Sequence, residues 1–184
     1  PEDAQLREFI AFDPEQNFPS PSFVRQIENQ NLHALNIPEL TIITSAALQT
    51  EAERVAQLHR EEGLTVAVIE QEKIFNEFSS GTPDASAYRR LMKMFYDRAE
   101  GNENVRPRYL LLFGDGSYNN RKSMEKLHSP ECNMLLTYQS KTSIDERESF
   151  VIEDYFGFLE DNSGEEIKVD KVCLGIGRFP ISSI

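Results

Sequence analysis

Three short apolar runs in the middle of the chain most constrain how it folds. They are Leu40–Thr44, Leu64–Ile69 and Tyr109–Phe113. Each run is nearly continuous in apolar character, which is typical of a strand buried on both faces of a parallel sheet. The segments between the runs are long enough for the crossover helix that joins two parallel strands. The spacing therefore predicts strands linked by helices.

Both connecting segments carry helix signals. In the first, apolar residues recur at helical spacing from Leu48 to His59, and Gly63 is placed to end the helix. In the second, Thr82 before Pro83 suits an N-cap followed by the first helical position. One face of that second helix is apolar: Tyr88, Leu91, Met92, Phe95 and Ala99. The whole pattern predicts an α/β fold with a mainly parallel sheet flanked by helices.

The C-terminal third has a different pattern. Leu135–Tyr138 and Tyr155–Leu159 resemble short strands, and Asp161–Gly164 has the composition of a hairpin turn. We therefore expect a short antiparallel addition to the sheet in this region. Val172–Ile176 predicts one more buried strand, which leads into Gly177-Arg178-Phe179-Pro180.

Residues 1–38 are polar and interrupted by prolines, so we interpret them as a lead-in segment from a preceding region. Two apolar patches, Phe9–Phe12 and Leu32–Leu35, would anchor it on the folded domain or on a preceding one. Residues 39–184 are expected to form that domain. Because the chain opens at Pro1 without Met, we expect it to begin within a longer protein.

Acidic residues outnumber basic ones by 31 to 19, which gives a formal net charge of -12. Binding to phosphates depends on clustered Lys and Arg, so a nucleic-acid partner and an acidic membrane surface are both disfavoured. No apolar run approaches the roughly 18 residues that suggest a transmembrane helix. The acids are dense from Asp145 to Asp170, where a cation would find oxygen ligands.

Candidate binding residues gather where the predicted strands end. Gly114, Asp115 and Gly116 follow the third strand, at the sheet edge where open α/β folds bind ligands. Two interpretations stay open: the turn shapes a substrate cleft, or it is structural, with Asp115 bonding main-chain amides. Arg178 follows the last strand, and its guanidinium is expected to pair with a carboxylate such as Asp115 or Asp154. These five residues are the substrate-cleft candidates.

No cofactor is predicted. The glycines at 114 and 116 make a weak dinucleotide fingerprint, because the third glycine is missing. Asp154 has the chemistry of a calcium ligand, but the spacing around it matches no calcium loop, and no metal site is assigned. Calcium binding stays open.

The chain offers cysteines and histidines for nucleophilic catalysis, but no convincing pair. Cys132 lies in a polar loop and Cys173 within an apolar run, while His59 falls on the apolar face of a predicted helix. His33 and His128 have no clear partner. We therefore predict neither a disulfide framework nor a catalytic dyad within these residues.

Six segments occur in a fixed order along the chain: Asn29–Leu35, Ile74–Asp84, Tyr88–Met94, Tyr109–Gly116, Asp154–Gly157 and Gly175–Pro180. Together they resemble the gingipain family of cysteine peptidases, in the branch that contains the sortases of type IX secretion. The similarity covers nearly the whole chain.

This resemblance implies a caspase-like fold and makes residues 39–184 the first subdomain of a peptidase domain. It implies a cysteine endopeptidase that removes C-terminal sorting signals from cargo proteins at the outer membrane or cell surface of a Gram-negative bacterium. The implied partners are those cargo proteins, other outer-membrane secretion components and the remainder of its own chain.

No catalytic residue is carried over from the family. Its catalytic histidine stands in a His-Gly motif, with the nucleophilic cysteine further on, and both follow the Gly-Arg-Phe strand. The present sequence stops at Ile184, shortly after that strand. Where Arg-specific gingipains have Gly-Asp-His, this chain has Gly114-Asp115-Gly116, so their specificity is not transferred. The alternative is a non-catalytic α/β protein-binding or scaffolding module.

Overall fold

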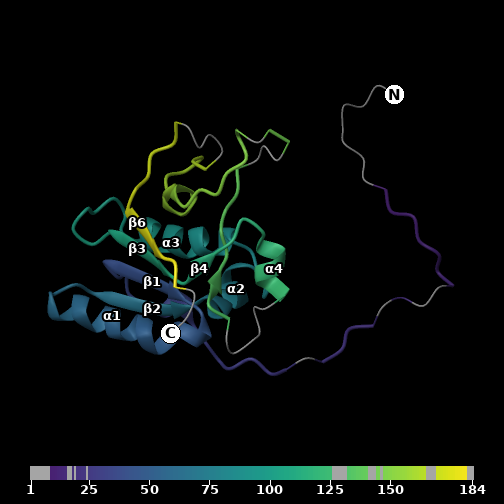
Figure 1. Ribbon diagram of the computed structural model, residues 1–184, viewed down its shortest axis with the longest axis horizontal. Helices are drawn as coiled ribbons and strands as arrows, with labels where there is room; N and C mark the ends of the chain where they lie inside the picture. The colour runs from purple at the N-terminus through teal and green to yellow at the C-terminus, as the bar shows by residue number, and fades with distance from the viewer. Residues whose placement is uncertain are drawn as a thin grey trace.

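A four-stranded parallel sheet forms the centre of the computed structural model (Figure 1). The strand order is β2-β1-β3-β6, and every neighbouring pair is parallel. The strands are β1 (Leu40–Thr44), β2 (Val66–Glu70), β3 (Tyr109–Phe113) and β6 (Gly175–Phe179). The structure describes residues 9–15, 18, 20–23, 25–125, 132–140, 144–145, 147–164 and 169–181.

Helices cover the two faces of the sheet unequally. Helix α1 (Gln49–Glu61) lies on one face, while α2 (Gln71–Phe78) and α3 (Ser86–Arg98) lie on the other (Figure 1). The shorter elements are η1 (Leu32–Ala34), η2 (Ala46–Leu48), α4 (Asn120–Glu125) and η3 (Asp154–Gly157). No helix among the described residues is long and apolar enough to cross a bilayer.

Alternation along β1 divides the core into two layers. Ile42 packs with Ala52 and Ala56 of α1, whereas its neighbour Ile43 packs in the larger cluster with α2 and α3. Both isoleucines are fully buried. Burying each side chain stabilises the fold by about 1.5–3 kcal/mol, so the continuous apolar run at β1 is required by both faces at once.

The structure confirms the α/β fold class and the three strands expected from the apolar runs. It corrects the start of α3, because Thr82 is not its N-cap. Thr82 closes the turn after α2, where its N–H donates to Ser79 O (3.0 Å) and its carbonyl accepts from Ser79 Oγ (2.6 Å). Asp84 instead accepts hydrogen bonds from Ser86, and α3 begins at Ser86.

The sequence pattern missed α2. This helix begins at Gln71, directly after β2 ends at Glu70, so no turn residue separates the two elements. It buries Ile74 and Phe75 against α3, and the Phe75 ring stacks on Tyr88 at 5.7 Å between centroids. The apolar spacing was present in the sequence, but a strand-to-helix junction without a loop hid the boundary.

The prediction of a strand at Tyr155–Leu159 is wrong. Residues 154–157 form the 3₁₀ helix η3, and residues 155 to 159 are all buried rather than alternating. Arg89 of α3 fixes this turn by donating to Phe158 O (2.7 Å) and Ser163 O (2.6 Å). Residues 161–164 do form a turn, but the described residues before it form η3 and irregular structure instead of a strand, so the turn does not follow a strand as a hairpin turn would.

Only part of the expected strand at Leu135–Tyr138 is present. A short second sheet pairs β4 (Asp115–Gly116) with β5 (Met134–Leu135), and this pairing is parallel. The antiparallel addition is limited, in the described residues, to one bridge between Gln139 and Val151.

The last strand lies three residues further along than predicted. It spans Gly175–Phe179 instead of Val172–Ile176, with Gly175 in register with Tyr109. Two glycines in five residues give little apolar signal, so the sequence pattern centred on the preceding valine, cysteine and leucine instead. The strand lies at a sheet edge and is half exposed, not buried as expected.

Residues 30–33, near the end of the lead-in segment, are held on α2 by one carboxylate. Glu77 accepts hydrogen bonds from Leu32 N–H (2.8 Å), Gln30 Nε2 (2.8 Å) and His33 Nδ1 (2.7 Å). The His33 ring also stacks on Phe78, with centroids 4.7 Å apart. The patch at Leu32 is therefore anchored on the domain, whereas Phe9 and its neighbours are exposed.

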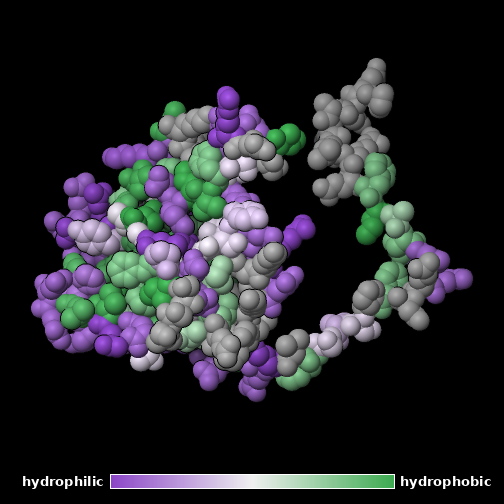
Figure 2. Space-filling model, viewed as in Figure 1, coloured by the Kyte–Doolittle hydropathy of each residue, from purple (hydrophilic) through white to green (hydrophobic). Residues whose placement is uncertain are grey.

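Among the described residues, α1 covers one face of the sheet over β1 and β2. Beyond α1, a hollow of about 720 Å³ is lined by β3 and β6, with Tyr109 and Phe179 41% and 48% exposed. Apolar residues show between hydrophilic ones in this part of the molecule (Figure 2). We call Tyr109, Leu111 and Phe179 with Gly175 and Gly177 the open face.

We predict that Glu77→Gln lowers the free energy of unfolding at pH 7 by about 1 kcal/mol. Burial works to raise the pKa of Glu77, but the hydrogen bonds from Leu32, Gln30 and His33 outweigh it and hold that pKa below its usual value. A lowered folded-state pKa stabilises above the unfolded pKa and loses its effect as pH falls through the folded value. Urea unfolding of both proteins at pH 7 and at about pH 3.5 should show the difference shrinking in acid.

We also predict that the 184-residue chain self-associates through the open face and the edge of β6, because both leave apolar or main-chain groups exposed. Phe179→Lys should lower the mass measured by light scattering at high concentration. Ile144→Lys, at an exposed position outside the open face, should leave that mass unchanged. A monomeric wild-type chain would contradict the prediction.

Candidate cleft wall at the carboxyl ends of the strands

The carboxyl ends of the parallel strands meet at one edge of the sheet. Thr44, Glu70, Phe113 and Phe179 are in register as the last residues of their strands. Open α/β sheets bind ligands at this edge. The predicted candidates from Gly114 to Gly116 follow directly after β3.

The turn at 114–116 needs its glycines because other segments approach it closely. A Cβ on Gly114 would lie 2.7 Å from Asn133 O, and one on Gly116 would lie 2.9 Å from Thr137 Cγ2 and 3.2 Å from Arg178 Cζ. Asp115 is held at both ends: its N–H donates to Asn133 O (2.9 Å), and its Oδ1 accepts from Gly116 N (2.8 Å). The turn is therefore packed on both sides.

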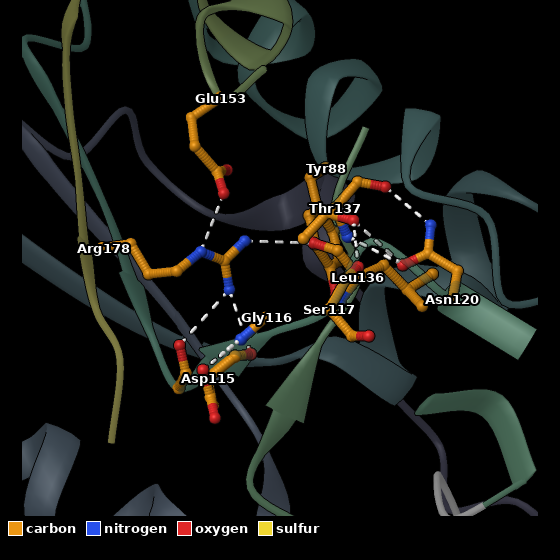
Figure 3. A network of polar contacts seen from close by, with 10 residues as sticks. Tyr88, Asp115, Gly116, Ser117, Asn120, Leu136, Thr137, Glu153 and Arg178 are labelled. Atoms are coloured by element: carbon orange, nitrogen blue, oxygen red, sulfur yellow. Dashed lines mark hydrogen bonds and ion pairs between the residues drawn. The ribbon is translucent and has the colours of Figure 1, made fainter. Parts of the chain in front are cut away.

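Arg178 joins three segments at this edge (Figure 3). Its side chain is only 12% exposed, and Nε donates to Glu153 Oε1 at 2.8 Å. One terminal nitrogen donates to the carbonyls of Gly114 (3.3 Å) and Asp115 (3.2 Å), and the other to Leu136 O (3.2 Å). The guanidinium thus ties β4, the segment after β5 and the start of η3 to β6.

The ion pair of Arg178 is with Glu153, which corrects the expected partners. Asp115 offers its carbonyl instead of its carboxylate, and Asp154 is exposed at the start of η3. Arg178, Asp115 and the two glycines are therefore brought together, while Asp154 lies outside the group. Sequence alone did not distinguish Glu153 from Asp154, because adjacent acids carry the same chemistry.

A buried tyrosine and glutamine hold the segment that follows β5. Tyr88 Oη donates to Gln71 Oε1 (2.6 Å) and accepts from Leu136 N (3.3 Å), while Gln71 Nε2 donates to Met134 O (2.8 Å). Burial raises the pKa of Tyr88 far above its usual value, so the hydroxyl stays protonated and can donate. Two helices thereby fix the main chain at 134–136.

Asn120 acts on the same segment from the opposite side. Its side-chain amide donates to Thr137 O (2.7 Å) and accepts from Thr137 N (3.1 Å). Thr137 Oγ1 donates to Ser117 O (2.6 Å) as well. Sequence reasoning had not singled out Asn120, Gln71 or Glu153, since each works through a partner distant in sequence.

Among the described residues, the hydrogen bonds of the cysteines and histidines go to partners other than one another. Cys132 is buried and Cys173 half-buried, and both are free thiols. His33 pairs with Glu77, and the Nδ1 of half-buried His59 lies 3.0 Å from Glu62. His59 follows the buried Ala52 and Ala56 at helical spacing, on the helix face that the sequence pattern assigned to it. The remaining candidate, His128, lies outside the described residues.

The acid-rich region contains paired charges. Lys93 Nζ lies 2.8 Å from Asp161 Oδ1, and this hydrogen bond and charge lower the pKa of Asp161. Within the ranges that the structure describes, no group of three His, Cys, Asp or Glu is arranged to hold a metal. Glu146, Glu165, Glu166 and Lys168, which belong to the same region, lie outside the described residues.

The family of the chain follows from comparison with known proteins. The model of peptidase family C25 matches residues 33–184. The chain belongs to peptidase family C25. This is the gingipain family of cysteine peptidases, as the sequence resemblance predicted. No curated protein sequence matches the chain significantly.

A solved structure of the same family extends the match to the fold. The C25 chain is 44% identical to the protein in the "crystal structure of dimeric latent PorU from Porphyromonas gingivalis", with a TM-score of 0.74. The match covers 85% of this chain but 15% of that one. The similarity confirms the resemblance and the caspase-like α/β fold, and the chain corresponds to a small part of PorU.

The packed turn gives a prediction with a built-in control. Gly116→Ala would force its Cβ against Thr137 and Arg178, so we expect the free energy of unfolding to fall by about 1–3 kcal/mol. Gly177→Ala places a Cβ in open space, and losing a glycine there should change stability by less than about 1 kcal/mol or raise it slightly. Urea unfolding followed by circular dichroism compares the two. Equal losses would show that the turn is not tightly packed.

Proposed function

We propose that this chain is the first half of the peptidase domain of a PorU-like sortase of type IX secretion. Such an enzyme is a cysteine endopeptidase that removes C-terminal sorting signals from cargo proteins. The observation that supports this most is the match to PorU, at 44% identity over 85% of the chain. The match of family C25 over residues 33–184 supports cysteine peptidase chemistry in the complete protein.

The chain would contribute scaffold and one wall of the cleft. Its polar groups at the carboxyl edge are engaged with one another: Arg178 with Glu153 and three carbonyls, and Asn120 with Thr137. Such fixed groups position a substrate and do not themselves break a bond. We therefore propose that the 184-residue chain is inactive by itself.

Bond cleavage would depend on groups further along the complete protein. There, a cysteine thiolate would attack the peptide carbonyl, with a histidine taking the thiol proton and delivering it to the leaving amine. Main-chain amides would stabilise the negative charge on the carbonyl oxygen. Neither Cys132, which is buried, nor Cys173 is assigned the nucleophile's role.

The proposal includes a location and partners. The complete protein would act at the outer membrane or cell surface of a Gram-negative bacterium, with cargo proteins and other secretion components as partners. The remainder of its own chain is the partner that would cover the open face.

The test begins with the gene beyond the codon for Ile184. A His-Gly motif followed by a cysteine should be present, and the complete protein should cleave a sorting-signal peptide. Iodoacetamide, which alkylates thiolates, should abolish cleavage. Replacing the downstream cysteine by serine should lower kcat/KM by at least about a thousandfold, while Cys132→Ser and Cys173→Ser should retain activity.

Two outcomes would contradict this proposal. An extension without both motifs would favour the alternative, a non-catalytic α/β module for protein binding or scaffolding. A complete protein whose biological role survives loss of the downstream cysteine would indicate a homologue that has kept only the scaffold.

A further inference from the structure

Residues 134–140 run from β5 to the bridge at Gln139, and the main-chain hydrogen bonds along them alternate in direction as they do in a strand. We call this segment the ledge. Its main-chain groups alternate in direction, as in any strand, so even-numbered residues face one edge and odd-numbered residues the other. The two edges have different partners.

Even-numbered residues of the ledge face inward and are bound. The N–H of Leu136 donates to Tyr88 Oη (3.3 Å), and its carbonyl accepts a hydrogen bond from Arg178 (3.2 Å). Tyr138 O accepts from Ile152 N (2.9 Å), and Ser140 N donates to Phe150 O (3.0 Å). This edge is therefore anchored from α3 to the antiparallel bridge at Gln139 and Val151.

The main-chain groups of odd-numbered residues face the opposite edge. Among the described residues, their hydrogen-bond partners are present at the start of this edge, near β4, but not at Gln139. Asn133 O accepts from Asp115 N in the β4 pairing, and Thr137 is bound through both its N–H and its carbonyl by the Asn120 amide. At Gln139 the series stops. Within the parts of the chain that the structure describes, the main-chain N–H and C=O of Gln139 make no hydrogen bond, and the residue is exposed.

Asn120 shows what this edge is shaped to bind. Its side-chain amide donates to Thr137 O and accepts from Thr137 N, which is the pair of bonds that one residue of a neighbouring strand makes. An amide therefore already fits the edge at Thr137, and Gln139 presents the same two groups one repeat further along. A hollow of about 450 Å³ lined by residues 82–85, Asn120 and residues 136–139 lies beside it.

We propose that the edge of the ledge at Gln139 binds an extended polypeptide through its main chain, as an added strand, and that this polypeptide is the protein substrate. The inference rests on the proposed peptidase function for the identity of the occupant. Recognition through N–H and C=O groups tolerates many side chains. With few hydrogen bonds available, binding at this edge by itself is weak.

The test uses the 184-residue chain labelled with ¹⁵N and the peptide Ac-Ala-Thr-Ala-Thr-Ala-Thr-NH₂ at millimolar concentration. Binding should shift the amide signals of Thr137 and the Asn120 side chain, which flank the site. Gln139→Pro removes the N–H and should weaken binding about tenfold. Gln139→Ala, the matched control, keeps the N–H and should bind as the wild type does.

A second measurement guards against misfolding of the proline variant. The fully N-methylated form of the same peptide has no N–H to donate and should not shift the Thr137 signal of the wild-type chain. Equal binding by Gln139→Pro and Gln139→Ala, equal binding of the methylated peptide, or no shift with either peptide would overturn the inference.

These outcomes separate the inference from the proposed function. Peptide binding at the ledge without cysteine-dependent cleavage by the complete protein would rule out the peptidase function but support the ledge as a site that binds polypeptides. Cleavage by the complete protein, together with equal affinities of the two Gln139 variants, would support the peptidase function and rule out peptide binding at the ledge.

Discussion

The carboxyl edge of the sheet depends on the guanidinium of Arg178. Its donors satisfy a carboxylate and three main-chain carbonyls that belong to segments far apart in sequence. Because the side chain is mostly buried, losing it would leave these oxygen atoms without compensation, and an uncompensated buried acceptor costs about 1–3 kcal/mol. The planar fork of arginine suits this arrangement, whereas a lysine ammonium is a point charge that cannot span the same acceptors.

Beyond the end of β5, side chains make the main-chain hydrogen bonds that a neighbouring strand would make in a sheet. Leu136 and Thr137 are held by Tyr88, Arg178 and Asn120, which come from three different elements. The position of the ledge is therefore set by helix packing as well as by strand pairing. Tyr88 links the two, since its ring packs between Phe75 and Phe156 while its hydroxyl reaches the ledge.

The sequence predicted those parts of the fold in which burial alone determines the residue type. The run at β1 is apolar because both sheet faces are covered there. The run at β3 is apolar because Leu110, Leu112 and Phe113 are buried, and the structure places both strands as expected. At β6 the sheet edge is half exposed and Gly175 and Gly177 carry no side chain, so the apolar signal shifted to the residues before it. At η3, continuous burial imitated a strand although the backbone turns.

The sequence predicted where the candidate site lies but not which residues its side chains contact. That Arg178 would lie near the turn at 114–116 follows from parallel strands ending at one edge. Which carboxylate it meets depends on the position of η3: Glu153, the residue before η3, contacts Arg178, whereas Asp154, its first residue, is exposed. Gln71 and Asn120 have no sequence signal, since polar residues at helix starts ordinarily face solvent.

The division of labour within the proposed peptidase follows from this geometry. The polar side chains described at the carboxyl edge are already bound to one another or to main-chain groups: Arg178 to Glu153 and Leu136 O, Asn120 to Thr137, and Tyr88 to Gln71. Such groups hold a main chain in place but do not exchange protons with a substrate. Thiolate chemistry requires a group that titrates near neutrality beside the nucleophile. Changes in this half should therefore act on substrate binding and on the geometry of attack, whereas the pH dependence of the bond-breaking step would arise elsewhere in the complete protein.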